Sequence, residues 1–99
     1  MKVARNLYAV FIRWVDTPMT VENLAKIDKV LGPLGDWLRF SGGNWLIDTD
    51  RSSKDVFMAL AEILRKGDSE LIIRVDPADY AGWAAEWVDE WVAKKARRP

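Results

Sequence analysis

The stretch DWLRFSGGNWLIDTD, residues 36–50, decides the fold that the sequence predicts. Residues 37–40 and 45–49 are rich in aromatic and branched side chains, which favour β-strands. Between them lies Ser41-Gly42-Gly43-Asn44, and glycine supplies the positive φ that tight hairpins require. The stretch is therefore predicted to be a β-hairpin.

The chain on both sides of this hairpin alternates between strand-like and helix-like patterns. Residues 7–15, LYAVFIRWV, are apolar on both alternating faces, which is typical of a central strand. The expected elements are, in chain order, a strand over 7–15, a helix over 21–31 that ends at Gly32 and Pro33, the hairpin, a helix capped by Ser52 or Ser53 that ends at Gly67, a strand over 71–75, and a helix that Asp76 caps and that runs from Pro77 to about Ala93.

This order predicts the α+β fold class. Strand, helix, two strands, helix and strand match the ferredoxin-like βαββαβ plan, with an antiparallel sheet in the order 4-1-3-2 and an added C-terminal helix. The 99 residues are expected to form one domain, with its core over 5–76, a tryptophan-rich helix over 77–93 and a basic tail over 94–99.

The plan covers one face of the sheet with two helices and leaves the other face open. The set expected to face the helices is Tyr8, Val10, Ile12, Trp14, Leu38, Phe40, Trp45, Ile47, Leu71, Ile73 and Val75. The set expected on the open face is Leu7, Ala9, Phe11, Arg13, Trp37, Arg39, Asn44, Leu46, Asp48, Ile72 and Arg74.

The open face has two interpretations. Arg13, Arg39 and Arg74 together with Trp37 are residue types that hold phosphates or stack on bases, so the face is a candidate nucleic-acid platform. Alternatively, Asp48 lies between two of the arginines in the predicted strand order, and cross-strand ion pairs account for them.

The last helix carries a broad apolar stripe that includes Tyr80, Trp83, Trp87 and Trp91. Such a stripe is too large to remain in water as an exposed patch. We expect it to cover the open sheet face of its own chain or to form an interface with a second copy or another protein, since tryptophan is enriched in interface hot spots.

The basic tail consists of Lys94, Lys95, Arg97 and Arg98. These charges either bind a few phosphates or form a solvated end that complements the C-terminal dipole of the helix.

Composition excludes several function classes. Lysine plus arginine equal aspartate plus glutamate at 15 each, and both cysteine and histidine are absent. Disulfides, thiolate chemistry and histidine catalysis are therefore excluded. No apolar run reaches the ~20 residues of a membrane span, so a cytoplasmic protein without cofactor is expected. Asp16 after the first strand is expected to be a turn residue that accepts backbone hydrogen bonds.

The stretches LGDWLRFSGGNWLIDTD, ELIIRVDP and AGW with the tryptophans after it resemble a known family. Between about Tyr8 and Trp91 the chain is similar to small bacterial ferredoxin-like proteins labelled SinR-like, which are related in fold to the CRISPR-associated small endonucleases and to virulence-associated protein D. The resemblance implies a domain that pairs as a homodimer through its sheets. In the nuclease relatives, an aspartate near the end of the first strand binds a divalent metal between two subunits. Here Arg13 or Trp14 occupies that place, and Asp16 fits with a shift.

The sequence thus leads to one main hypothesis and two alternatives. The main one is a non-enzymatic, homodimeric binding module that acts through the tryptophan-rich helix and the arginine-bearing sheet face. One alternative is a Mg²⁺-dependent endonuclease with Asp16 from each subunit at the metal. The other is a nucleic-acid-binding protein without catalysis.

Overall fold

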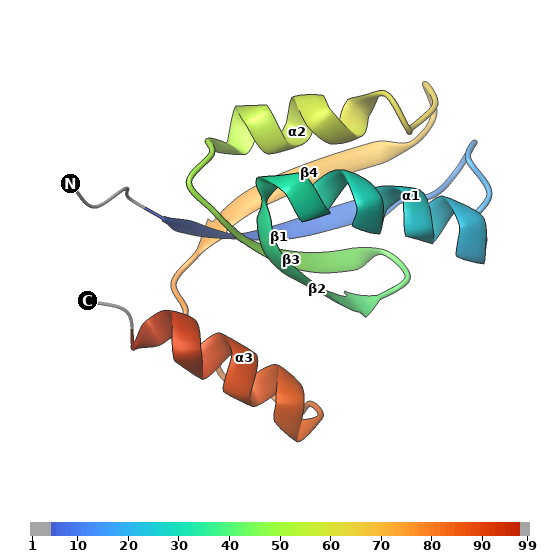
Figure 1. Ribbon diagram of the computed structural model, residues 1–99. Helices are drawn as coiled ribbons and strands as arrows, with labels where there is room; N and C mark the ends of the chain where they lie inside the picture. Colours follow the sequence, from blue (N-terminus) through green and yellow to red (C-terminus); the bar gives the residue numbers. More distant parts are fainter. Residues whose placement is uncertain (1–4, 98–99) are drawn as a thin grey trace.

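The computed structural model describes residues 5–97, and this part of the chain forms a four-stranded antiparallel sheet with three α-helices (Figure 1). It is an α+β protein, as the sequence predicts. The elements are β1 Asn6–Arg13, α1 Val21–Leu31, the short 3₁₀ helix η1 Gly32–Leu34, β2 Gly35–Ser41, β3 Asn44–Thr49, α2 Ser53–Ala61, β4 Ser69–Val75 and α3 Glu86–Ala96.

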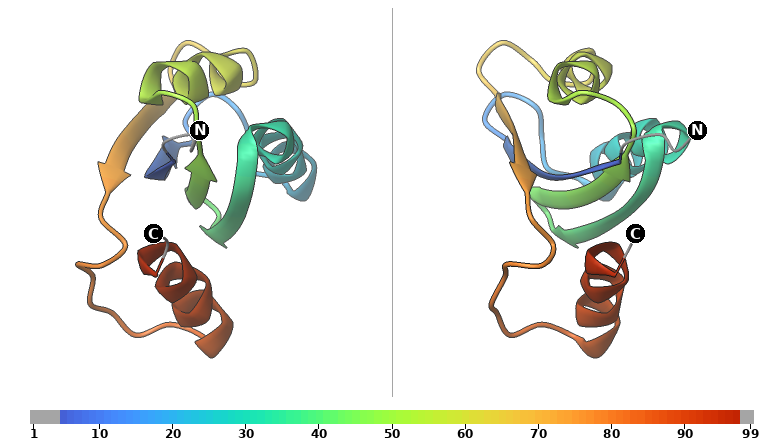
Figure 2. Two further views of the ribbon diagram at one scale, coloured as in Figure 1. Left: turned by 60° about the vertical axis from the view of Figure 1, so that its left-hand side comes forward. Right: turned by 90° about the vertical axis from the view of Figure 1, so that its left-hand side faces the viewer.

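The sheet has the order β2-β3-β1-β4, and each pair of neighbours is antiparallel. Read from the β4 edge, this is the order 4-1-3-2 that the sequence predicts. Helices α1 and α2 lie on one face of the sheet, and α3 lies on the other face (Figures 1 and 2). The molecule therefore has three layers, with the sheet in the middle.

The main core lies between the sheet and the two helices α1 and α2. Its buried members are Tyr8, Val10, Ile12, Ile27, Leu31, Trp45, Ile47, Val56 and Leu60. Trp45 is the largest of the fully buried side chains, and its Nε1–H donates a 2.8 Å hydrogen bond to Oδ1 of Asp28 on α1. The indole is thus buried with its polar group satisfied, as buried tryptophans usually are.

Side-chain caps fix where α1 and α2 begin. The hydroxyl of Thr20 accepts from the N–H of Asn23, and the hydroxyl of Ser52 accepts from the N–H of Asp55, both at 3.1 Å. These are standard N-cap contacts, and Ser52 rather than Ser53 is the cap. Helix α2 ends at Ala61, well before the predicted end at Gly67.

The hairpin between β2 and β3 forms as predicted, but glycine is needed there for another reason. No described glycine has a positive φ. A Cβ on Gly43 would lie 2.8 Å from the carbonyl oxygen of Ile12, and one on Gly42 would lie 2.7 Å from the sulfur of Met19. The Nε1–H of Trp14 also donates to the carbonyl of Gly42 at 2.8 Å. Glycine is required at position 43 because the turn packs closely against the backbone at the end of β1, whereas the exposed side chain of Met19 can move away from a Cβ on Gly42.

The predicted faces of β2 are wrong. Trp37 lies opposite Ile47 and Arg39 lies opposite Trp45, so both belong to the helix-covered face. Leu38 lies opposite Leu46 and faces α3 instead. All three residues precede the irregularity between Arg39 and Ser41, so it is not the cause. Both faces of β2 carry apolar residues, so the alternation does not show which face the helices cover.

The predicted faces of β4 are wrong for a different reason. Ile72 lies opposite Val10 and packs against the main core, whereas Leu71 and Ile73 lie on the other face and are 56% and 45% exposed. Val75 shares their face, and Arg74 shares the face of Ile72. Alternation misleads at this strand, because the face with the charged Glu70 and Arg74 is the one turned towards the helices at the sheet edge, and the aliphatic face is the other one.

Helix α3 begins at Glu86, nine residues after the predicted start at Pro77. The carboxylate of Asp76 accepts from the N–H of Ala78 at 2.9 Å, which turns the chain rather than starting a helix. Gly82, a poor helix former, lies within the linker 76–85. The linker therefore contains Tyr80 and Trp83.

Candidate functional site

Helix α3 covers part of the open sheet face of its own chain. Val88 and Val92, one turn apart, are buried at 8% and 6% exposure. Trp91 is half-buried beside them. The buried stripe of the helix therefore runs through the valines, and the tryptophans lie at its margin. The sequence leaves open whether the helix covers its own sheet or another chain; in this structure it covers its own.

A largely buried lysine side chain, that of Lys95, joins the end of α3 to the sheet. Asp36 and Asp48 lie directly opposite each other on β2 and β3, a like-charge pair that is unfavourable by itself. The ammonium of Lys95 lies 2.5 Å from a carboxylate oxygen of Asp36 and 3.8 Å from one of Asp48. Arg5 adds a second contact, with its Nε 3.4 Å from Asp48. Lys95 also lies 4.5 Å from the ring centre of Trp91, within cation–π range.

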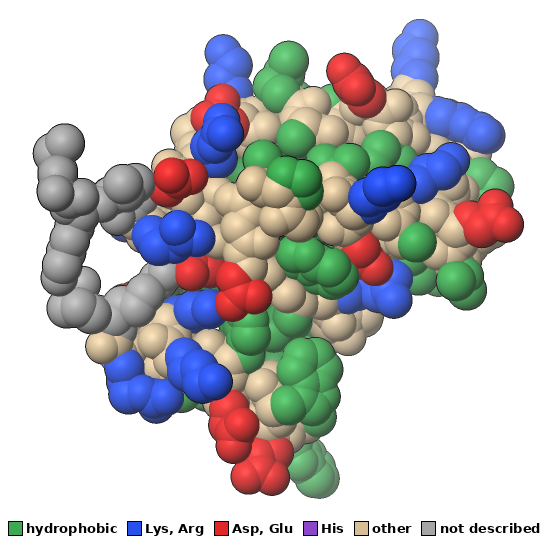
Figure 3. Space-filling model, viewed as in Figure 1, with side chains coloured by type: hydrophobic (Ala, Val, Ile, Leu, Met, Phe, Trp, Pro, Cys, Tyr) green, Lys and Arg blue, Asp and Glu red, His purple; other side chains and the backbone are tan. Residues whose placement is uncertain are grey.

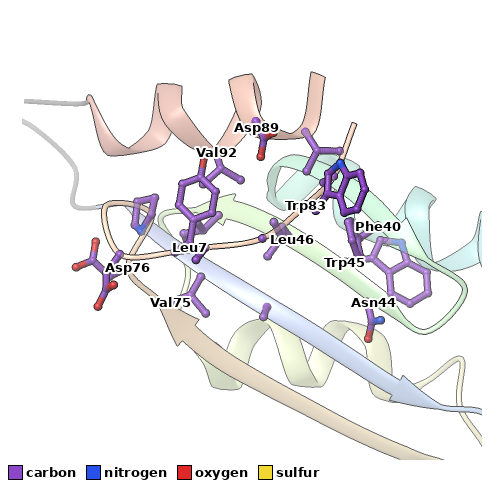
Figure 4. Close-up of a pocket in the computed structure, with 18 of the residues that line it drawn as sticks. Leu7, Phe40, Asn44, Trp45, Leu46, Val75, Asp76, Trp83, Asp89 and Val92 are labelled. Carbon is purple, nitrogen blue, oxygen red and sulfur yellow. The ribbon is translucent and has the colours of Figure 1, made fainter. Parts of the chain in front are cut away.

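A groove remains between the sheet and the chain that leads into α3. It has a volume of about 450 Å³. Leu7, Ala9, Phe11 and Leu46 line it from the sheet, Phe40 from the hairpin, Tyr80 and Trp83 from the linker, and Val88 and Val92 from α3. Figure 4 shows Trp83 and Phe40 towards one end of the groove, with Leu7, Leu46 and Val75 along the sheet below α3. This is the largely apolar, concave kind of surface that binds ligands.

The charged residues that line the groove are all acidic. Asp76 and Asp79 come from the linker and Asp89 from α3, and no lysine or arginine lines the groove among the described residues. Figure 3 shows acidic side chains beside the hydrophobic ones on α3 and basic side chains towards the C-terminal end of that helix. The groove therefore combines an apolar floor with a negative rim.

The aromatic residues predicted for the interface are not on one helix face. Trp83 is completely exposed, Trp87 is 56% exposed and Tyr80 is 50% exposed. Two of these side chains belong to the linker, because α3 starts later than predicted. Trp83 and Tyr80 do line the groove, together with Phe40, for which strand alternation wrongly predicts the helix-covered face.

The residues predicted to bind nucleic acid are scattered over the molecule. Arg13 ends β1 on the open face, and Arg74 lies on the helix-covered face at the β4 edge. Arg39 pairs with Asp28 at 3.3 Å, and Trp37 packs against the main core. The predicted placement of Asp48 between Arg13 and Arg39 is therefore wrong.

The predicted basic tail is divided as well. Lys95 is held against the sheet, whereas Lys94 in the last turn of α3 and Arg97 at its C-cap are exposed. Arg98 lies outside the described residues.

Asp16 takes part in a contact between two loops. Its Oδ2 accepts from the N–H of Gly67 at 2.7 Å, and its carbonyl accepts from Arg65 at 3.0 Å. Among the described residues there is no cluster of three or more metal-ligating side chains. Metal binding by Asp16 in a dimer stays a prediction.

The centre of this loop contact is Asp68, which the sequence did not single out. Its Oδ1 accepts from the consecutive N–H groups of Val15, Asp16 and Thr17 at 2.7–3.1 Å, and its Oδ2 accepts from the hydroxyl of Thr17 and from the N–H of Arg65. Desolvation raises the pKa of Asp68, but the hydrogen bonds from Thr17, Arg65 and Val15 outweigh it and hold the pKa well below its ordinary value of 3.8.

Replacement of Asp68 with asparagine should make the free energy of unfolding less dependent on pH in the acidic range. Because the folded pKa of Asp68 is lowered, its contribution is present above the ordinary value of 3.8 and is lost as the pH falls through the folded pKa. Urea unfolding of Asp68→Asn should show a lower midpoint than wild type at about pH 7 and a moderately smaller difference at about pH 3, where the unfolded carboxylate is already largely protonated and the folded one is still ionised. An equal difference at both values would contradict this role, and Asp55→Asn on the exposed first turn of α2 is the matched control.

Comparisons of the chain with protein-family models, with curated proteins and with solved structures found no match. No helix in residues 5–97 is both long enough and apolar enough to cross a membrane.

Proposed function

We propose that this protein is a non-enzymatic interaction module with a ferredoxin-like fold, acting in the cytoplasm. It binds an apolar segment of a partner protein that also carries lysine or arginine. The observation that carries the proposal is the apolar groove with its acidic rim. The same proposal includes that the protein is related to the SinR-like proteins that its sequence resembles.

The first support is the exposed aromatic surface at the groove. Trp83 is fully exposed, and Phe40 is 56% exposed on the facing hairpin. Together with Tyr80 they form an apolar patch that stays largely in contact with water in the isolated chain. Patches of this kind mark protein interaction sites. Each large aromatic buries roughly 150–250 Å² when covered, so these side chains are suitable anchors for a partner segment.

The second support is the charge of the rim. Asp76, Asp79 and Asp89 surround an apolar floor without a compensating cation among the described lining residues. Complementary potentials steer association and select partners. The rim favours a segment with lysine or arginine beside its apolar anchors, and it disfavours phosphates in the groove.

A random peptide display library is the probe that tests this function. Selection on the wild-type protein, with the Trp83→Ala variant as competitor, should enrich peptides that combine apolar anchors with lysine or arginine. A selected peptide should bind Trp83→Ala at least about tenfold more weakly, equivalent to ~1.4 kcal/mol. Asp79→Lys should weaken the same peptide in a salt-dependent manner.

The matched control is Val21→Ala, which removes an 82% exposed apolar side chain at the start of α1, away from the groove. Its affinity for the peptide should equal that of wild type. Failure to enrich any Trp83-dependent peptide, or enrichment of acidic peptides, would overturn the proposed function.

A further inference from the structure

Strand β4 is an edge of the sheet with regular backbone geometry along its length. It spans seven residues, Ser69–Val75, and contains neither proline nor a register shift. The other edge strand, β2, carries an irregularity between Arg39 and Ser41. Figure 2 shows β4 at the outer edge of the sheet, with no described segment beside it. A long regular edge presents unpaired N–H and C=O groups that accept another strand.

We infer that β4 pairs with β4 of a second copy of this chain, antiparallel and centred on Ile72, so that the two sheets become one. This inference goes beyond the proposed function and concerns a different surface. It rests on the sequence of the strand, SELIIRV, and on the faces that its side chains occupy.

The register follows from the order of residues in β4. In a two-fold antiparallel pair centred on Ile72, Glu70 lies opposite the partner's Arg74, and Leu71 lies opposite the partner's Ile73. Glu70 and Arg74 share the helix-covered face, because they lie opposite Ile12 and Tyr8 of β1. Leu71 and Ile73 share the other face and are half-exposed in the single chain. The two-fold axis creates each of these pairs twice, and cross-strand pairs of opposite charge or of apolar residues stabilise sheets.

Alternative registers lose this complementarity. Centring the pair on Ile73 places Glu70 opposite the partner's Asp76, which is a like-charge contact. Centring it on Leu71 places Glu70 opposite the partner's Ile72. Among symmetric antiparallel registers, only the one centred on Ile72 pairs the carboxylate with the guanidinium.

The single chain leaves both of these charges unpartnered within the described residues. Oε1 of Glu70 is buried without a hydrogen-bond partner, and Arg74 makes no ion pair there. Burial also raises the pKa of Glu70 to about 7, which shows that its ionised form is unfavourable in the single chain. A guanidinium from the facing strand supplies the counter-charge that this carboxylate lacks.

Sedimentation equilibrium of charge-exchanged variants tests the inference. Wild type should show a concentration-dependent species with twice the monomer mass of 11.3 kDa. Glu70→Arg alone, or Arg74→Glu alone, places like charges opposite each other and should weaken dimerisation at least about tenfold. The double variant Glu70→Arg, Arg74→Glu should restore it. An equimolar mixture of the two single variants should form a heterodimer, because each introduced charge then faces its opposite.

The controls Glu22→Arg and Lys29→Glu exchange exposed charges on α1, away from β4. They should leave the dimer unchanged. A wild-type protein that is monomeric at all concentrations would overturn the inference. A dimer that both single variants preserve would also overturn it, since the contact would then lie elsewhere. Circular dichroism on each variant confirms that a loss of dimer is not a loss of fold. The groove proposal is tested through the Trp83→Ala variant and the dimer through the Glu70 and Arg74 variants. One proposal can therefore be overturned while the other stands.

Discussion

Replacing Gly35 with alanine should lower the free energy of unfolding by about 3 kcal/mol, at the upper end of the usual cost of overpacking. A Cβ at this position would collide with the carbonyl oxygen of Asp48 and lie 3.2 Å from Cα of Thr49. These atoms belong to the backbone of β3, so no side chain can rotate away. Relief requires the first residue of β2 to separate from its partner Thr49.

Urea denaturation of Gly35→Ala against Gly82→Ala measures this effect. Gly82 lies in the linker, and a Cβ added there would have nothing within 4 Å, so alanine at this position should change the stability by less than about 0.5 kcal/mol. The two variants make the same chemical change, and they differ in the backbone that the added methyl group meets. Equal stabilities would show that β2 can move away from β3 without loss.

The central strands were predictable because their patterns are unambiguous. Residues 7–12 form an apolar run typical of a central strand, and the observed register places Tyr8 and Val10 opposite Ile47 and Trp45 on the helix-covered face. The hairpin follows from its glycine pair, and α1 from apolar residues recurring at helical spacing before a stop at Gly32 and Pro33. Local pattern and tertiary packing agree in these elements, so sequence alone identifies them.

The edge strands and the last helix were not predictable, because long-range contacts decide them. Leu71, Ile72 and Ile73 are chemically alike, and only pairing with β1 determines that Ile72 is the one that enters the core. The start of α3 depends on where Val88 and Val92 contact the sheet. The spacing of the tryptophans instead predicts that they form the buried stripe and that the helix starts at Pro77.

The candidate site could be predicted only in part. Trp83 and Tyr80 stand out in the sequence through their size, and both line the groove. The predicted face of Phe40 is wrong, like that of Leu38, because both faces of β2 carry apolar residues and the pattern does not show which face α1 and α2 cover. The acidic rim could not be foreseen because Asp79 and Asp89 lie on separate segments, ten residues apart in sequence, that only the folded linker brings together.

Replacing Lys95 with methionine should cost about 2 kcal/mol, within the range for hydrogen bonds to charged groups, because it removes a largely buried ammonium from between the like-charged Asp36 and Asp48. The side chain of Lys95 is 12% exposed, and that of Asp48 is 6% exposed. Asp36 and Asp48 lie opposite each other across the strands, and Lys95 is the contact from α3 that both share. Methionine keeps most of the packing against Trp91 and removes the charge. Amide hydrogen exchange should therefore show faster exchange throughout α3, while α1 and α2 change little.

A neighbouring lysine separates this effect from a general loss of positive charge. Lys94→Met changes an exposed side chain in the same last turn, and its stability should stay within about 0.5 kcal/mol of wild type. The repulsion between Asp36 and Asp48 is tested by adding Asp48→Asn to Lys95→Met. If repulsion between the two aspartates causes the loss, the double variant should be more stable than Lys95→Met alone, a coupling that a double-mutant cycle measures. If the double variant loses further stability instead, the role of Lys95 is packing against Trp91 rather than charge. In that case the helix is attached to the sheet by its apolar contacts, chiefly Val88 and Val92.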